Sequence, residues 1–151
     1  MNLSDIRAVD CDVHPTVPSM QTLLPYLNDH WRETVIEREI TTLDTISYPP
    51  LAPLTARADF RGENGRAGLD ASEVGQQALD KWQADIAILN CLYGVQLVFN
   101  EDMAQAFARA VNDWVVKEWL DREPRLRASI VVPLQNVEHA VDEIERCAVD
   151  K

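Results

Sequence analysis

The spacing of apolar residues along the chain predicts three strands. Along residues 6–14 apolar and polar side chains alternate with the period of two that is typical of a half-buried strand, and Pro15 then ends the element. One side carries Val9, Cys11 and Val13, and the other carries Ala8, Asp10, Asp12 and His14. Residues 85–92 are almost continuously apolar, as expected for a buried parallel strand, and residues 126–132 form a similar third run.

Apolar residues at helical spacing predict three helices: one before the second strand, one between the second and third strands, and one after the third. Residues 101–122 carry the clearest amphipathic stripe, and Asn100 precedes them as an N-cap. A capping box beginning at Asp70 opens a helix that runs to about residue 83. The last helix begins after Asn136, with an apolar stripe on one face and acidic residues on the other. The stripe consists of Val137, Ala140, Val141 and Ile144, and the acidic face consists of Glu138, Asp142, Glu143 and Glu145.

A long irregular segment, from about residue 15 to residue 69, separates the first strand from the first clear helix. Residues 20–27 and 30–39 are expected to hold a few helical turns each, and residues 57–68 are expected to form a mobile loop. Loops of more than about fifteen residues are uncommon in compact domains and usually serve a function, so this segment is expected to cover a site.

The order of these elements is strand, long loop, helix, strand, helix, strand, helix. Strands that alternate with helices predict an α/β fold, with a parallel sheet and right-handed crossover connections. The tryptophans of the helical regions, Trp82, Trp114 and Trp119, are expected to pack in the core between helices and sheet.

Composition and charge exclude several classes of function. The 151 residues are 46% hydrophobic and 26% charged, which is typical of one globular domain. The net charge of −11 disfavours nucleic acid and anionic membranes as partners, and no apolar run reaches the ~18 residues of a membrane span. We therefore expect a soluble, cytoplasmic protein. The three cysteines lack metal-binding or disulfide-type spacing, and we expect those at 11 and 91 to behave as small hydrophobic residues.

The motif Asp10-x-Asp12-x-His14 is the strongest candidate for chemistry. The carboxyl-terminal ends of parallel strands form the active-site floor of (β/α)₈ barrels, and Asp12 and His14 lie at that end of the first strand. A carboxylate and an imidazole two residues apart suit a divalent metal such as Zn²⁺ or Mn²⁺. The spacing alone is a weak pattern and favours the alternative, in which Asp12 and His14 bind each other or cap the following loop.

Several blocks of sequence resemble one known family in the same order. The first blocks are Asp10-Cys-Asp-Val-His-Pro15 and Leu24-Pro-Tyr-Leu-Asn-Asp-His-Trp-Arg32. Ala87-Ile-Leu-Asn-Cys-Leu-Tyr-Gly94, Ala110-Val-Asn-Asp-Trp114 and Arg127-Ala-Ser-Ile-Val-Val-Pro133 follow. Together they resemble the amidohydrolase-related family, also called amidohydrolase 2, across essentially the whole chain.

The resemblance implies a metal-dependent enzyme on a TIM barrel. Members include amino-carboxymuconate-semialdehyde decarboxylase and related aromatic-acid decarboxylases, besides hydrolases. It implies that residues 1–151 form a partial (β/α)₈ barrel of about three βα units, with a loop excursion over about 15–69. The family's first-strand H-x-H motif, or its acidic variant, corresponds to Asp12-x-His14, so both residues become expected ligands of a divalent metal, Zn²⁺ or Mn²⁺. In the acidic variant the alternative is that only the acidic residue, here Asp12, binds the metal, and that the histidine, here His14, contacts substrate instead.

Other polar residues have weaker claims. Asn90 lies near the carboxyl-terminal end of the predicted second strand, and Gln135 comes just after the third. Side chains there can touch substrate, although a structural anchoring role is the alternative. The family's remaining ligands, two histidines and an aspartate, come from later strands. His30 and His139 are not expected to replace them, and Trp31 is expected either to cover the pocket or simply to pack.

The strand count sets two hypotheses against each other. A full barrel needs about 250 residues, so we expect the chain to be either an N-terminal fragment or a split subunit completed by another chain, with a homo-oligomer as a further possibility. Ile86, Ile88 and Val131 are then expected to face a barrel interior that lacks its opposite wall. The first hypothesis is a hydrolase or decarboxylase acting on a small, carboxylated or carbonyl-containing substrate. The second is a non-catalytic truncated barrel.

Overall fold

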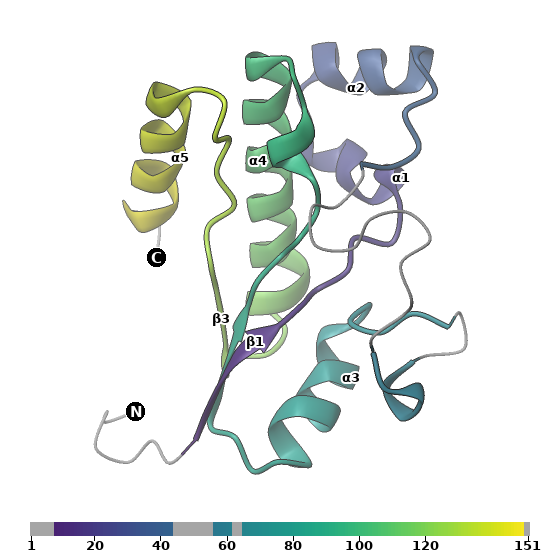
Figure 1. Ribbon diagram of the computed structural model, residues 1–151, viewed down its shortest axis with the longest axis vertical. Coiled ribbons are helices and arrows are strands. Elements are labelled where there is room, and N and C mark those ends of the chain that lie inside the picture. Colours follow the sequence, from purple (N-terminus) through teal and green to yellow (C-terminus); the bar gives the residue numbers. More distant parts are fainter. Residues whose placement is uncertain (1–7, 44–55, 62–64, 150–151) are drawn as a thin grey trace. The chain divides into compact units, whose positions relative to one another are not determined.

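The structure is a computed structural model, and it describes residues 8–43, 56–61 and 65–149 (Figure 1). Residues 6 and 7 of the predicted first strand, and parts of the long segment, lie outside the described residues. The chain divides into two compact units, which are described separately. The sheet unit comprises Met1–Thr16, Pro53–Cys91 and Val115–Ser129, and the helical unit comprises Val17–Ala52, Leu92–Trp114 and Ile130–Lys151.

A three-stranded parallel sheet organises the sheet unit. Its strands are β1 (Val9–Val13), β2 (Ile86–Leu89) and β3 (Leu126–Ala128), in the order β1-β2-β3. The parallel α/β arrangement predicted from the sequence is confirmed, and it is compatible with part of a TIM-barrel-like fold. The third strand is shorter than predicted and ends at Ala128, although the Ser129 N–H still donates to the Leu89 carbonyl at 2.9 Å. The number of barrel units stays a prediction.

Of the helical segments in the sheet unit, η4 (Gly75–Asp80) packs on β1 and β2, and η6 (Val116–Leu120) packs on β3. The predicted helix after Asp70 consists of α3 (Ala71–Val74) and a π-helical continuation, η4 (Gly75–Asp80). The Asp70 carboxylate accepts hydrogen bonds from the backbone N–H groups of Ser72 and Glu73, which confirms it as the N-cap. The other segments are η3 (Ala58–Phe60) and the π-helical η6 (Val116–Leu120). The most deeply buried side chains here are Leu79, Ala87, Leu89, Trp119 and Leu126.

The helical unit is built on α4 (Glu101–Val115), whose last residue lies in the sheet unit. Asn100 accepts a hydrogen bond from the Met103 N–H at 2.9 Å, as expected of its predicted N-cap role. The other helical elements are α1 (Met20–Leu23), η2 (Leu24–Tyr26), α2 (Asp29–Glu37), η5 (Val95–Leu97) and α5 (Val137–Val149). Phe107, Val111, Met20 and Leu23 are fully buried. None of the helices described is long and apolar enough to cross a membrane.

The side of the last helix that packs inward is not its apolar stripe. On α5 the side chains of Val137, Val141 and Ile144 are exposed, whereas Glu143 is completely buried. Ala140 of the predicted stripe is partly buried. The physical reason lies on α4, where polar and charged residues offer Glu143 a full set of partners, so the ridge of α5 that packs inward is polar. Hydrophobic periodicity alone does not reveal such a pairing.

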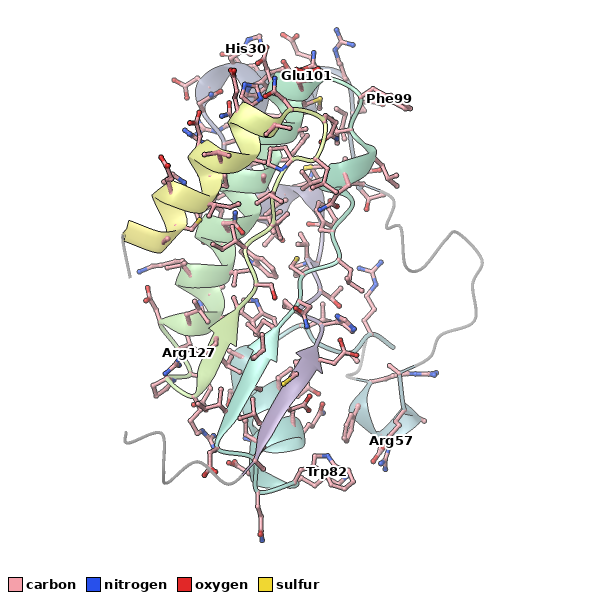
Figure 2. All side chains as sticks on the ribbon, turned by 60° about the vertical axis from the view of Figure 1, so that its left-hand side comes forward. His30, Arg57, Trp82, Phe99, Glu101 and Arg127 are labelled. Carbon is pink, nitrogen blue, oxygen red and sulfur yellow. The ribbon has the colours of Figure 1, made fainter. Side chains whose placement is uncertain are left out.

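Three further expectations about packing need correction. Trp114 and Trp119 are buried as predicted, but Trp82 is 58% exposed and lies beside the Lys81 ammonium group (Figure 2). Val131 is buried rather than facing an open interior, because Asn112 binds its backbone. Cys11 is exposed and does not act as a small core residue.

Candidate functional site

The predicted metal ligands of the first strand meet in the structure. The Asp12 Oδ1 and His14 Nε2 atoms are 3.2 Å apart at the carboxyl-terminal end of β1. The Asp12 side chain is 79% exposed, whereas that of His14 is 31% exposed. A carboxylate open to solvent thus lies against a half-buried imidazole.

The other imidazole nitrogen of His14 fixes the position of its proton. Nδ1 lies 2.9 Å from the backbone carbonyl oxygen of Asn90, the residue that follows β2. A carbonyl oxygen only accepts hydrogen bonds, so Nδ1 must carry a hydrogen. In the neutral imidazole Nε2 is then an acceptor, and it faces the carboxylate of Asp12, which is also an acceptor. Two acceptors repel each other at this distance unless a second imidazole proton or a cation lies between them.

The pair fits two positions in the coordination sphere of a divalent metal. Two ligands at ~2.0–2.2 Å from a tetrahedral Zn²⁺ are separated by about 3.3–3.6 Å from each other, and the observed 3.2 Å lies close to that range. Histidine ligands usually donate their second N–H to a carbonyl or carboxylate, as His14 does to Asn90. Within the described ranges no group of three His, Cys, Asp or Glu side chains is placed to hold a metal. The alternative pairing, a direct ion pair between protonated His14 and Asp12, uses the same geometry.

An irregularity in β1 shapes this end of the sheet. Asp10 pairs with Ala87 and Val13 pairs with Leu89, so Cys11 and Asp12 together oppose the single residue Ile88. This is a β-bulge, a feature that commonly re-aims a side chain next to an active site. The Asp10 carboxylate accepts a hydrogen bond from the Asp12 N–H at 3.1 Å, which supports the bulged backbone.

Gly68 allows two backbone segments to come close together just after His14. Gly68 has a φ of +70°, and a Cβ atom added there would lie 2.3 Å from the His14 carbonyl oxygen. Its carbonyl accepts a hydrogen bond from the Thr16 N–H at 2.7 Å, and the Thr16 hydroxyl donates to the Ala67 carbonyl. The end of the long predicted loop therefore packs against the chain that follows His14, and only glycine allows so close an approach.

Asn90 lies where predicted, and its side chain contacts the two strands on either side of β2. Its Nδ2 donates to the Cys11 carbonyl at 2.9 Å, and its Oδ1 accepts from the Ser129 hydroxyl at 2.5 Å. Its backbone N–H donates to the Val13 carbonyl at 2.7 Å. These contacts are those of an anchor, and substrate binding by Asn90 stays a prediction. The sequence did not single out Ser129, because a serine directly after a strand carries no distinctive signal.

The other predicted residues belong to the helical unit. Gln135 donates from Nε2 to the carbonyls of Val95 and Val98, at 2.9 and 2.6 Å, so it anchors the segment before α4. Its role toward substrate also stays a prediction. His139 lies beside Asp102, with 4.0 Å between His139 Nε2 and Asp102 Oδ1. The His30 and Trp31 rings contact each other edge to face, with centroids 4.7 Å apart.

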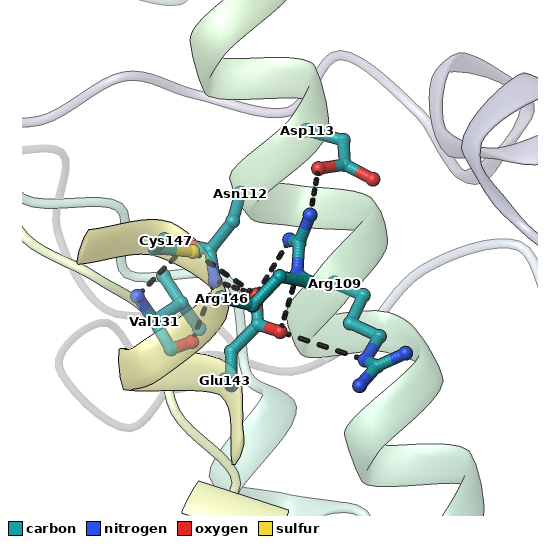
Figure 3. Close-up of polar contacts among 7 residues, drawn as sticks. All are labelled: Arg109, Asn112, Asp113, Val131, Glu143, Arg146 and Cys147. Carbon is teal, nitrogen blue, oxygen red and sulfur yellow. Dashed lines mark hydrogen bonds and ion pairs between the residues drawn. The ribbon is translucent and has the colours of Figure 1, made fainter. Parts of the chain in front are cut away.

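Sequence reasoning missed a second polar cluster, between α4 and α5 (Figure 3). The Glu143 carboxylate accepts hydrogen bonds from Arg146 at 2.7 and 2.8 Å and from Asn112 at 2.7 Å, and Arg109 lies 3.5 Å away. The Cys147 thiol donates to the same carboxylate at 3.3 Å. Arg146 also donates to Asp113 at 2.8 Å. We name these residues, Arg109, Asn112, Asp113, Glu143, Arg146 and Cys147, the helix-pair cluster.

The partners of Glu143 outweigh the cost of its burial. Burial, the largest single influence, raises the pKa of this carboxyl, but hydrogen bonds from Arg146 and Asn112 more than compensate and hold the pKa below its usual range. Burial and the neighbouring Glu143 carboxylate raise the pKa of the Cys147 thiol to about 11. The cluster is therefore ionised at its carboxylate and protonated at its thiol near neutral pH.

Comparison with known proteins assigns a family to the chain. A family model described as amidohydrolase matches residues 9–151, a range that begins at β1 and includes Asp12 and His14. No curated protein matches the chain. Amidohydrolase family members are usually metal-dependent hydrolases, which agrees with the donor chemistry of Asp12 and His14. The chain belongs to the amidohydrolase family.

Proposed function

We propose that the chain supplies the first-strand part of the catalytic site of a metal-dependent hydrolase or decarboxylase. In this proposal the Asp12 carboxylate and Nε2 of His14 hold a divalent ion, Zn²⁺ or Mn²⁺. The substrate is a small molecule with a carboxylate or carbonyl group, and an aromatic acid of the kind used by amino-carboxymuconate-semialdehyde decarboxylase-like enzymes fits the description.

One observation carries the proposal. The His14 ring donates from Nδ1 to the Asn90 carbonyl, and its Nε2 faces the Asp12 carboxylate at 3.2 Å. This arrangement places a nitrogen and an oxygen ligand side by side, which is the donor chemistry of a cation site. The exposure of Asp12 leaves that point open to solvent, so an ion held there would keep positions for water or substrate.

Each residue of the site has a separate task. When bound, a divalent ion lowers the pKa of a coordinated water or polarises a carbonyl or carboxylate oxygen. Asp12 contributes the negative charge that makes cation binding favourable. His14 contributes a neutral nitrogen whose direction is set by Asn90, and Gly68 lets the following chain pack close without displacing His14.

Calorimetric titration of the full chain with ZnCl₂ and MnCl₂ tests the metal site. We expect Asp12→Ala and His14→Ala each to weaken binding at least about tenfold, as loss of a ligand should. His30→Ala and Asp142→Ala are matched controls, because both side chains are exposed and lie elsewhere in the chain. Unchanged affinity in both site variants would refute the assignment of these ligands.

A second candidate is a chain that acts only after another polypeptide contributes ligands. The observation that favours it is that Asp12 and His14 supply two donors, and no third His, Cys, Asp or Glu joins them within residues 8–43, 56–61 and 65–149. Each outer strand, β1 and β3, also has a single neighbour in the described sheet. Sub-stoichiometric metal and no turnover of ester, amide or aromatic-acid substrates by the chain alone would favour this candidate over independent catalysis.

A further inference from the structure

Asn90 is linked to all three strands at their carboxyl-terminal ends. It follows β2 directly, its backbone N–H donates to Val13 of β1, and its side chain contacts the carbonyl of Cys11 and the hydroxyl of Ser129. Its backbone carbonyl accepts the Nδ1–H of His14 at 2.9 Å. One residue therefore connects the ladder to the imidazole of the proposed metal ligand.

Each hydrogen bond of the Asn90 side chain fixes the direction of the next one. The Cys11 carbonyl only accepts, so the nitrogen of the Asn90 amide must face it, and the amide oxygen must then face Ser129. Because that oxygen also only accepts, the Ser129 hydroxyl donates to it. The amide of Asn90 consequently has one orientation that satisfies both neighbours.

The β-bulge explains why a side chain is needed here. Where Cys11 and Asp12 oppose one residue of β2, the regular ladder is interrupted, and the Nδ2 of Asn90 binds the Cys11 carbonyl in its place. The bulge is also the segment that carries Asp12. Asn90 thereby fixes the backbone of one proposed ligand and the ring of the other.

We propose that Asn90, oriented by Ser129, is a positioning residue that holds His14 in the tautomer protonated at Nδ1 and turns Nε2 toward Asp12. The placement of His14 by Asn90 is independent of any metal, whereas its consequence for metal affinity rests on the proposed function. Asn90 acts through His14 and does not itself need to contact substrate.

Nitrogen NMR of the His14 imidazole in the metal-free chain tests the proposal. At a pH where His14 is neutral, we expect distinct protonated Nδ1 and unprotonated Nε2 signals in the native protein. Asn90→Ala should move both signals toward the averaged position of a freely exchanging imidazole. Ser129→Ala should do so to a smaller extent, and Ser129→Thr, which keeps the hydroxyl, should restore the native pattern.

The controls separate positioning from a general loss of structure. Ser72→Ala removes an exposed serine hydroxyl of the same unit and should leave the His14 signals unchanged. If Asn90→Ala does not fold, the Ser129 pair decides alone. Native His14 signals in Ser129→Ala and in any folded Asn90→Ala would overturn the proposal.

Metal titration of the same variants distinguishes this inference from the proposed function. If Zn²⁺ binds, Asn90→Ala should weaken it about tenfold, the lower end of the loss typical for a group that orients a ligand, because the carbonyl that binds His14 remains and loses only the side-chain contacts that place it. Unchanged affinity would count against positioning. If the native chain binds no Zn²⁺ while the His14 signals still depend on Asn90 and Ser129, the positioning role stands and the metal proposal fails.

Discussion

The helix-pair cluster and the Asp12–His14 pair differ in how their charged groups are buried and balanced. In the helix-pair cluster the Glu143 side chain is 0% exposed and every partner donates to it. At the strand ends the Asp12 side chain is 79% exposed. Its Oδ1 atom faces Nε2 of His14, which is an acceptor in the neutral ring because Nδ1 carries the hydrogen. The protein supplies donors to the carboxylate of the first cluster, whereas in the second cluster a proton or a cation joins Asp12 to His14. We therefore expect the first to determine stability and the second to determine ligand binding.

The largest expected effect comes from removing the buried carboxylate. Glu143→Ala leaves Arg146, Arg109 and Asn112 without their common acceptor, and breaking a buried ion pair costs about 3–5 kcal/mol. We expect the lower end, about 3 kcal/mol, because Arg146 and Arg109 are partly exposed. Urea denaturation measures the change in the free energy of unfolding. Glu138→Ala, an exposed carboxylate on the same helix, is the matched control, and equal effects from both substitutions would contradict the comparison.

A second effect concerns the reactivity of Cys147. Burial and the charge of Glu143 raise its pKa to about 11, so little thiolate exists near pH 8. We expect alkylation of Cys147 in the folded chain to be at least about tenfold slower than in the urea-unfolded chain, where the usual thiol pKa is restored. Peptide mass spectrometry after a timed reaction measures the rate. Rapid labelling of Cys147 in the native state would show that its contact with Glu143 is absent.

A smaller effect is the pH dependence of stability. Because the folded-state pKa of Glu143 is depressed, its contribution is fully present above the unfolded-state pKa of about 4.3 and is lost as the pH falls toward the folded value. The difference in unfolding free energy between the native chain and Glu143→Gln should therefore shrink below about pH 4. A difference that grows on acidification would reverse the sign of the proposed pKa shift.

The smallest effect on stability is expected at the strand ends. Asp12→Asn removes an exposed charge and should change the free energy of unfolding by less than about 0.5 kcal/mol, while it weakens Zn²⁺ binding at least about tenfold. Parallel denaturation and titration of this variant check both values. Strong destabilisation without loss of metal affinity would mean that Asp12 serves the fold in the way that Glu143 does.

The strands, the helix caps and the meeting of Asp12 with His14 could be predicted because each depends on local sequence. An alternating strand ending at Pro15 and an N-cap such as Asp70 are written in a few consecutive residues. Asp12 and His14 share a strand, so their contact needs no information about the rest of the fold.

The features that escaped prediction depend on residues distant in the chain. Glu143 is buried because Asn112 and Arg109 of another helix bind it, and the apolar pattern of α5 gave no sign of this. Ser129 acquires its role only when β3 is placed beside β2. The β-bulge likewise becomes visible only in the register of two strands.

The most direct test of the account is a Zn²⁺ titration followed through the imidazole nitrogens of His14, His30 and His139. The account predicts that the Nε2 signal of His14 shifts on metal binding while its Nδ1 stays protonated, and that Asp12→Ala abolishes the shift. A metal-induced shift at His30 or His139 with His14 unchanged would contradict it.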